Sequence, residues 1–334
     1  MFRLQEARSG IEMRKWLAVL LIFAGLTVVV LNFAEVENFA FLLERAQPLW
    51  LLAAVVFQVS TYVSVAACWS VVLRASGSPR PLGTLVPLSV AKLFADQAVP
   101  TAGISGNIVL VDRLIAVGVP RGHAVSALVF SIIGYYAAYA TLAVTMLVLL
   151  WLHNEATVLL AGVVSVFLLL ALAVALGTVW LVHRGDRIPD RLRRIAVIGK
   201  TADLLAEAPA DLLRNRPLIL KAALLNALVF LADAATLWVV LAAVGDPVRF
   251  STAFIPFIMA SIAATLGPTP MGLGSFEAVC IGMLRLLHVP LEAAVAATLL
   301  LRGFTLWLPM LPGMMIARRM VRLAGAHRLP TNPQ

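Results

Sequence analysis

The sequence has few charged residues, few cysteines and few histidines, and each shortage excludes a class of protein. Only 13% of its 334 residues are Asp, Glu, Lys or Arg, and 61% are hydrophobic, far from the composition of a soluble globular domain. The two cysteines, Cys68 and Cys280, lie in separate apolar runs, which excludes a disulfide framework. The five histidines lie at segment ends without metal-site spacing, and no P-loop or nucleophile elbow is present. We therefore expect no enzymatic activity, no cofactor and no metal.

The net charge of +9 does not indicate a nucleic-acid partner. The basic residues lie between apolar runs rather than along one helical face or within an RNA-binding motif. Orientation in a membrane explains the same pattern more simply.

Six apolar runs are long enough to cross about 30 Å of hydrocarbon as helices. A further two, 82–118 and 250–288, are broken in the middle by Pro and Gly, which leaves arms too short to span. Broken backbone is tolerated at membrane depth only where protein or water satisfies it, so these regions are expected to be re-entrant hairpins. The six expected spans are Trp16 to Ala34, Leu49 to Leu73, Ala124 to Leu152, Ala156 to Val182, Leu218 to Val244 and Ala293 to Ala317.

Marker residues recur at a nearly constant spacing of 168 to 170 residues, which indicates an internal repeat. The pairs are Trp69 and Trp238, Pro87 and Pro256, Pro100 and Pro268, Gly106 and Gly274, and Pro120 and Pro290. Each copy is expected to contain a span, a broken hairpin and a span, and the loop charges place the copies in opposite orientations. The fold class is therefore an all-α polytopic membrane protein with six full spans and two re-entrant hairpins in an inverted-topology repeat.

The apolar runs and the repeat divide the chain into five regions, and the loop charges place both termini in the cytoplasm. We expect an anchor helix and external loop at 1–48, a first repeat at 49–152, and a second repeat at 218–319. Between the repeats, 153–217 holds a span and a cytoplasmic amphipathic segment. A cytoplasmic tail follows at 320–334.

Both hairpins carry a motif that resembles the lysylphosphatidylglycerol synthase transmembrane family, also called flippase-like membrane proteins. In the second half the resemblance is carried by Pro268 to Glu277, His288-Val289-Pro290 and Leu299 to Pro309; in the first half by Pro100 to Gly106, Gly118-Val119-Pro120 and Tyr135 to Tyr139. It covers the chain from about Leu49 to Arg319. The resemblance implies an integral protein of the bacterial inner membrane that handles lipids, without the cytosolic aminoacyl-transferase domain of some relatives.

The two breaks are the expected substrate site. Each is followed by a helical arm that begins near mid-membrane, and a helix N-terminus favours a phosphate or carboxylate. Ser105, Asn107 and Ser275 can equally be simple helix caps. The expected substrate-binding residues are Pro100, Thr101, Gly103, Ser105, Gly106, Asn107, Pro268, Thr269, Gly272, Gly274, Ser275, Glu277 and Arg302.

Charged residues within the apolar segments are expected to face inward, because desolvating them in lipid costs at least a few kcal/mol. Arg302 is expected to hold either Glu277 or a lipid phosphate. Glu277 can cap its own helix or act as a proton-linked gate. Lys92, Asp96 and Asp233 are candidates for coupling, although Lys92 and Asp96 can neutralise each other. For Asp233 the expected structural partners are Asn226 and Trp238.

Three functions are compatible with these features. The first is translocation of an anionic or phosphate-bearing lipid between leaflets, with membrane lipids as partners. The second is a non-transporting membrane partner of an envelope-lipid biosynthetic enzyme, either in such a complex or as a homo-oligomer. The third is a secondary transporter of a small solute or ion. A site that opens sideways to lipid distinguishes the first from the third.

Overall fold

The computed structural model describes residues 44, 46–98, 104–153, 155, 157–184, 207, 210–267 and 272–316. Within these residues every regular element is a helix. Three expected elements lie outside the described residues: the anchor helix Trp16 to Ala34, most of the amphipathic segment Arg184 to Arg216, and the tail at 320–334.

The first four described helices form a span, two short arms and a second span. Pro48 starts the first helix, a position at which proline's missing N–H leaves no hydrogen bond unmade. Gly118, at a φ of 83°, follows the second arm, and Pro120 is the N-cap of the next helix. The elements are α3 (Pro48–Ala75), α4 (Leu82–Ala98), α5 (Ile104–Ala116) and α6 (Arg121–Leu152).

The same order returns in the second half of the chain after one additional long helix. His288 takes the place of Gly118 with a φ of 68°, and Pro290 takes that of Pro120. The elements are α7 (Val158–Arg184), the short η2 (Ala210–Arg214), α10 (Arg216–Ala243), α11 (Phe250–Leu266), α12 (Ser275–Leu286), α13 (Leu291–Arg302) and the π-helical η4 (Gly303–Trp307). Beyond η4 the helix continues to Ile316.

Five described helices are long and apolar enough to cross a membrane, and they coincide with five of the six predicted spans. These are α3, α6, α7, α10 and the continuous helix Leu291–Ile316. The arms α4 and α11 have 17 residues each, which corresponds to about 26 Å of helix and is short of the hydrocarbon thickness. Their partners α5 and α12 are shorter still. The chain is therefore an integral membrane protein with two interrupted helical regions.

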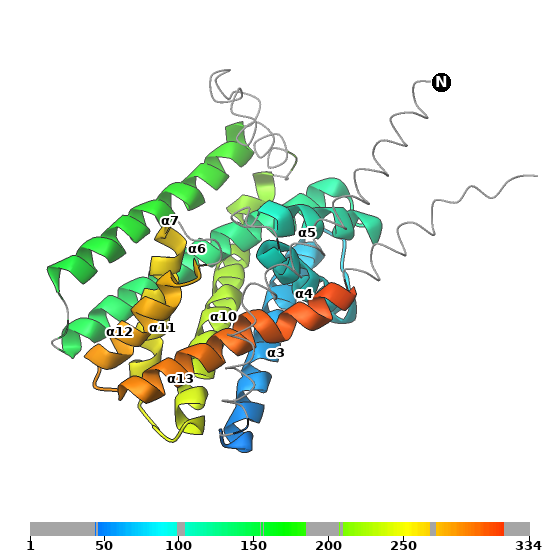
Figure 1. Cartoon of the computed structure of the whole chain (residues 1–334). Helices are drawn as coiled ribbons and strands as arrows, with labels where there is room; N and C mark the ends of the chain where they lie inside the picture. Colours follow the sequence, from blue (N-terminus) through cyan, green and yellow to red (C-terminus); the bar gives the residue numbers. More distant parts are fainter. Residues whose placement is uncertain are drawn as a thin grey trace, which may run out of the picture.

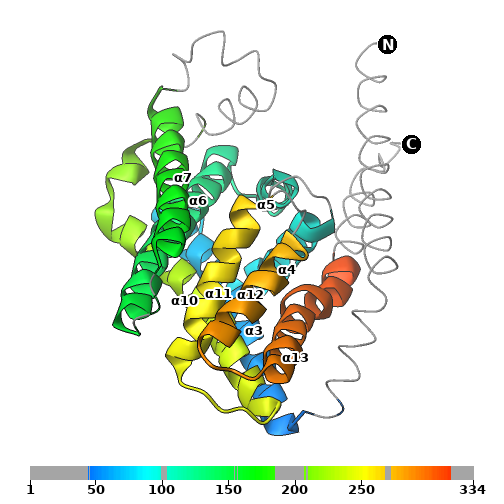
Figure 2. The ribbon, with the colours of Figure 1, turned by 60° about the vertical axis from the view of Figure 1, so that its left-hand side comes forward.

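The two ends of the first interrupted region lie close together. The Arg80 guanidinium, just before α4, donates two hydrogen bonds to the Val117 carbonyl just after α5, at 3.1 and 3.0 Å. Ser78 Oγ lies 2.8 Å from Nδ1 of His123, in the first turn of α6. The start of α4 and the end of α5 therefore lie at the same end of the bundle. Figure 2 shows the second pair, α11 and α12, side by side with α13 next to α12.

The centre of the molecule is an antiparallel pair formed by the first helix of each half, α3 and α10 (Figure 1). The Gln47 amide, at the start of α3, donates to the Ala243 carbonyl at the end of α10. Farther along, Gln58 Nε2 donates to Thr236 Oγ1 at 3.0 Å, and Asn226 Nδ2 lies 3.6 Å from Cys68 Sγ. The last two contacts are equivalent, because Gln58 corresponds to Asn226 and Cys68 to Thr236 at the same spacing of 168 residues.

Small residues let α6 cross α10 closely. A Cβ atom at Gly134 would lie 2.9 Å from the backbone carbonyl of Ala222, so only glycine fits without displacing α10. One apolar cluster contains Phe130, Trp69 and Leu110; in the other, Tyr139 packs with Phe167 and Phe230. The helices α3, α6, α7 and α10 contribute to both apolar clusters and so connect the two halves.

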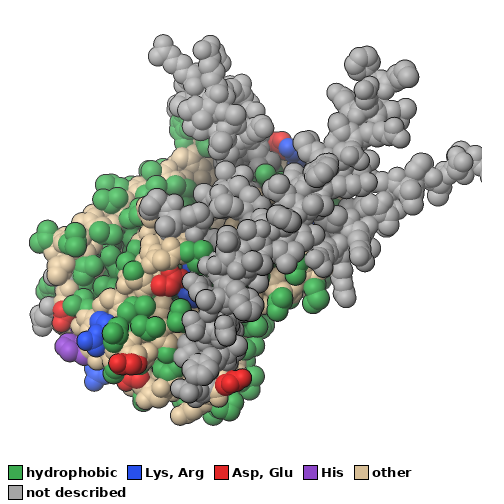
Figure 3. Space-filling view, viewed as in Figure 1, with side chains coloured by type: hydrophobic (Ala, Val, Ile, Leu, Met, Phe, Trp, Pro, Cys, Tyr) green, Lys and Arg blue, Asp and Glu red, His purple; other side chains and the backbone are tan. Residues whose placement is uncertain are grey.

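The surface of the bundle is largely apolar. On α7, Val158, Leu159 and Leu169 are exposed, a pattern that fits a helix facing hydrocarbon. Apolar side chains likewise cover much of the described surface in Figure 3, and most of the charged side chains visible in this view lie in its lower part.

Candidate functional site

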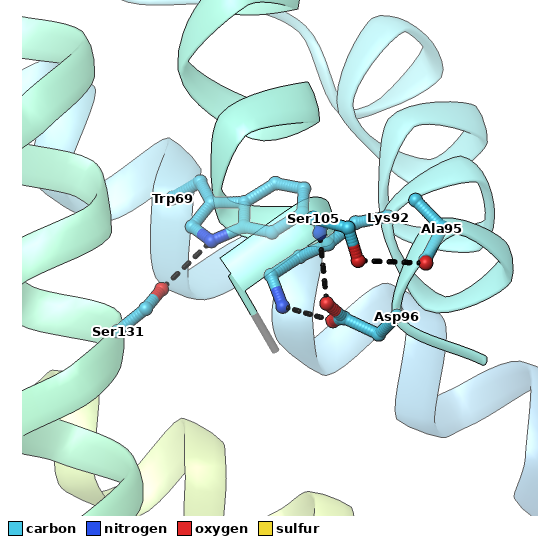
Figure 4. A network of polar contacts seen from close by, with 7 residues as sticks. Trp69, Lys92, Ala95, Asp96, Ser105 and Ser131 are labelled. Atoms are coloured by element: carbon cyan, nitrogen blue, oxygen red, sulfur yellow. Dashed lines mark hydrogen bonds and ion pairs between the residues drawn. The ribbon is translucent and has the colours of Figure 1, made fainter. Parts of the chain in front are cut away.

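The first break is closed by a carboxylate that reaches across it from α4. Asp96 lies in the last turn of α4, and its Oδ1 accepts a hydrogen bond of 2.8 Å from the Gly106 amide in the first turn of α5 (Figure 4). Its Oδ2 pairs with Lys92 Nζ at 2.7 Å, one turn earlier on α4. Ser105 Oγ donates to the Ala95 carbonyl at 2.8 Å. The predicted neutralisation of Lys92 by Asp96 is therefore confirmed, and Asp96 also caps the second arm.

Glycine at position 106 leaves room for the Asp96 carboxylate, which would have to move if the residue carried a side chain. A Cβ atom there would lie 2.3 Å from Asp96 Oδ1. The break thus depends on a close approach between the backbone of one arm and a side chain of the other.

The second break is closed by a carboxylate from its own second arm. Glu277 lies in the first turn of α12, and its Oε2 accepts a 2.6 Å hydrogen bond from the Gly274 amide. Gly274 and Gly272 both have positive φ, 82° and 66°, and a Cβ at Gly272 would collide with Ala264 of α11. Ser275 Oγ donates to the Gly272 carbonyl at 3.1 Å, so it stabilises the turn. The predicted role of Glu277 as a helix cap is confirmed.

Arg302 is the cation of the second break, and it comes from a different helix. Its Nε pairs with Glu277 Oε1, and the two side chains are only 9% and 15% exposed. Its Cζ lies 4.9 Å from the centroid of the Phe276 ring, a cation–π distance. Glu277 is one of the two partners predicted for Arg302, and the structure contains this pair.

The helix that carries Arg302 changes geometry immediately after it. Residues Gly303–Trp307 form one π-helical segment, a local feature that is frequent at functional sites. Within it, the Thr305 carbonyl accepts a hydrogen bond of 3.3 Å from Gln97 Nε2, at the end of α4. Farther along, Gly313 packs so closely on α4 that a Cβ would lie 2.6 Å from Phe94 Cβ. The last helix therefore contacts the first hairpin through Gln97 and the second hairpin through Arg302.

Gln97, Thr305 and the π-helical segment were not identified from the sequence. The available signal was a single amide, Gln97, directly before the proline-containing break. A π-helical segment has no recognisable residue pattern here, since Gly303 alone does not distinguish it from an ordinary helix.

Asp233 lies elsewhere, in the central pair of helices. Gln58 Nε2 donates to its Oδ1 at 2.9 Å. The expectation that Asn226 and Trp238 satisfy Asp233 is wrong: Asn226 donates to the Ala222 carbonyl, and the Trp238 indole donates to the Val248 carbonyl. The donor comes from the facing helix because Asp233 points towards α3.

Some predicted site residues are not tested by the structure. Asn107 is half-buried in the first turn of α5. Outside the described residues lie Pro100, Thr101, Gly103, Pro268 and Thr269. Among the residues that the structure does describe, no group of three His, Cys, Asp or Glu side chains is placed to bind a metal ion.

The match to a known family covers the site and almost all of the fold around it. Residues 16–313 match the model described as the lysylphosphatidylglycerol synthase TM region. The chain belongs to this family. It is thus a lipid-related membrane protein, as the hairpin motifs predicted. No curated protein matches the sequence significantly.

Proposed function

We propose that this family member moves an anionic or phosphate-bearing lipid between the leaflets of the bacterial inner membrane. The observation that carries the proposal is that one helix, Leu291–Ile316, touches both broken hairpins, through Gln97 on one side and Glu277 on the other. Interrupted helices and buried charges are costly in hydrocarbon unless they satisfy one another or line a path for a polar group. A lipid headgroup that crosses the membrane needs such a path.

We propose further that the two halves are inverted repeats related by a two-fold axis in the membrane plane. The antiparallel packing of α3 on α10 supports this, because these helices are equivalent in the repeat. The contacts of Gln58 with Thr236 and of Asn226 with Cys68 support it independently, since a two-fold rotation exchanges them. Inverted repeats with broken helices are the recurring architecture of transporters that alternate access around a central site.

In the proposed orientation, the end of the bundle that contains Arg74, Arg80, Arg121 and Arg216 faces the cytoplasm. The opposite end carries Glu44, Glu155, Asp246 and Glu292. Both termini then lie in the cytoplasm. Single cysteines at Ala75 and Thr157 test this with an impermeant maleimide, because native Cys68 and Cys280 are buried. Labelling at position 157 and not at 75 in intact cells is expected, and the reverse would contradict the orientation.

Arg302 is the proposed contact for the lipid phosphate, because it is the cation that links α13 to the second break. A guanidinium binds phosphate through two parallel hydrogen bonds, whereas an ammonium acts as a point charge. Charge-assisted hydrogen bonds of this kind contribute about 1.5–3 kcal/mol each. Loss of one from the translocation step therefore slows it by roughly 10- to 100-fold.

The experiment is a leaflet-exchange assay with fluorescent phosphatidylglycerol in vesicles that contain the purified chain. We expect Arg302→Gln to slow exchange by roughly 10- to 100-fold and Arg302→Lys to restore it partly. Arg249→Gln is the matched control, since Arg249 is exposed in the loop before α11. Wild-type exchange no faster than that of protein-free vesicles would contradict lipid transport. It would favour the alternative of a partner for a lipid-synthesising enzyme.

A further inference from the structure

Glu277 and Arg302 form an ion pair, and each also contacts a further group of the second break. One carboxylate oxygen pairs with Arg302, and the other accepts the Gly274 amide. The face of the guanidinium lies against Phe276. The Glu277 carboxylate therefore binds two groups that suit an anion. They are the buried guanidinium of Arg302 and the backbone amide of Gly274 at the start of α12.

A lipid phosphate offers the same chemistry as this carboxylate. Both are anions with two oxygens at a spacing that a guanidinium can bind side by side. Both are also favoured at a helix start. Groups that recognise the Glu277 carboxylate would consequently recognise a phosphodiester.

The charge balance allows only one of the two anions at Arg302. The pair is neutral as it stands, and a second anion would leave an uncompensated charge in a site shielded from water, which is unfavourable. A phosphate can bind only when Glu277 leaves Arg302 and reaches water or takes up a proton. Binding is then an exchange of one anion for another.

The backbone beside both partners differs from a regular helix. Glu277 follows a turn built on Gly272 and Gly274, and a Cβ at Gly274 would meet nothing within 4 Å. Arg302 directly precedes the π-helical segment. The first hairpin differs, because Lys92 and Asp96 lie on the same arm and the Asp96 carboxylate fills the space beside Gly106.

We propose that Glu277 is a built-in competitor for the headgroup phosphate at Arg302. This inference rests on the proposed function and specifies its substrate class as lipids with a phosphodiester anion. Exchange of Glu277 for the phosphate opens the second break when a lipid binds, and the return of Glu277 expels the lipid. Removing the carboxylate therefore strengthens binding, whereas removing the guanidinium abolishes it.

The test is binding of short-chain phosphatidylglycerol to the purified full chain in detergent, measured by calorimetry. We expect Glu277→Gln to bind it at least tenfold more tightly than the wild type. Arg302→Gln and the double variant Glu277→Gln/Arg302→Gln are expected to lose binding. Glu292→Gln is the matched control, because it removes an exposed carboxylate from the first turn of the neighbouring α13 and is expected to change nothing.

Inorganic phosphate and glycerol phosphate form separate arms that distinguish a lipid from a free phosphate. If they bind Glu277→Gln as tightly as the lipid does, the site takes free phosphate and the lipid assignment is overturned. If Glu277→Gln folds poorly, Glu277→Asp gives the same test, since a shorter side chain holds Arg302 less well and binding should tighten by a smaller factor. Added lipid should also raise the melting temperature of Glu277→Gln more than that of the wild type.

The outcomes separate this inference from the transport function. Unchanged or weaker lipid binding by Glu277→Gln would overturn the competitor role, even if wild-type vesicles exchange lipid and Arg302→Gln vesicles do not. Tighter binding by Glu277→Gln without any wild-type exchange would support the competitor role and contradict transport. In exchange assays Glu277→Gln is expected to be slower than the wild type, because the bound lipid is no longer expelled.

Discussion

A carboxylate closes the break in each of the two hairpins, but the residues it contacts differ. In each, a carboxylate accepts a backbone amide of the second arm and pairs with a cation. In the first hairpin, Asp96 comes from the arm before the break, and its cation Lys92 lies one turn away on the same arm. In the second, Glu277 comes from the arm after the break, and its cation Arg302 belongs to another helix. The first hairpin is therefore closed by its own residues, and the second depends on the last span.

This difference assigns separate roles to the two halves. The contacts of Asp96 tie α4 to α5 and involve no third helix. The contacts of Glu277 tie α12 to α13, whose next turns also touch α4 through Thr305 and Gly313. The same continuous helix thus contacts both breaks. In the proposed exchange of Glu277 for a phosphate, the first hairpin keeps its contacts while the second opens.

The largest expected effect comes from removing the carboxylate of each pair. Glu277→Ala leaves the guanidinium of Arg302 buried without a counter-charge, a loss of about 3–5 kcal/mol. Asp96→Ala leaves Lys92, which is more exposed, and the Gly106 amide without a partner, a loss of about 1–3 kcal/mol. Thermal unfolding in detergent should therefore rank Glu277→Ala below Asp96→Ala in melting temperature.

The double variants Glu277→Ala/Arg302→Ala and Asp96→Ala/Lys92→Ala control for lost packing. The first is expected to recover part of the stability lost by Glu277→Ala, because no charge then remains unpaired. Equal losses at the two pairs, or no recovery in the first double variant, would show that the hairpins do not differ in this way.

A smaller effect is expected from a single methyl group at the first break. Gly106→Ala places a Cβ within the Asp96 carboxylate, which must move and give up its hydrogen bond. We expect a loss of about 1–3 kcal/mol, typical of overpacking. Gly83→Ala, in the same hairpin with nothing within 4 Å of its Cβ, should be neutral or stabilising. Similar melting temperatures for the two variants would contradict the close approach at Gly106.

Sequence patterns were sufficient to predict the helices and the charged pair that lies within one helix. The apolar lengths located five spans, and the i, i+4 spacing of Lys92 and Asp96 gave their pairing. The proline and glycine spacing likewise predicted the repeated order of elements. These features depend on residues near each other in the chain, or on exact repetition along it.

Contacts between distant helices were harder to predict. The pairing of Glu277 with Arg302 was one of two alternatives, because a carboxylate and a phosphate suit a guanidinium equally well. The partner of Asp233 was sought on its own helix and lies on α3 instead. The hydrogen bond from Gln97 to the Thr305 carbonyl depends on the helix crossing and on the π-helical segment, and neither has a signature in one sequence.

The smallest expected difference is between Gln58 and Asn226, which are equivalent in the repeat but unequal in their partners. Gln58 donates to Asp233 and Thr236, whereas Asn226 donates to the Ala222 carbonyl of its own helix and lies near Cys68. Gln58→Met should therefore cost about 1–3 kcal/mol, because it leaves a carboxylate without its donor, and Asn226→Leu should cost about 1 kcal/mol or less. Adding Asp233→Leu to Gln58→Met should recover stability, since both partners are then apolar. These losses are measured as changes in melting temperature in detergent. If Asn226→Leu lowers the melting temperature more than Gln58→Met does, the Asp233 carboxylate does not distinguish the two halves.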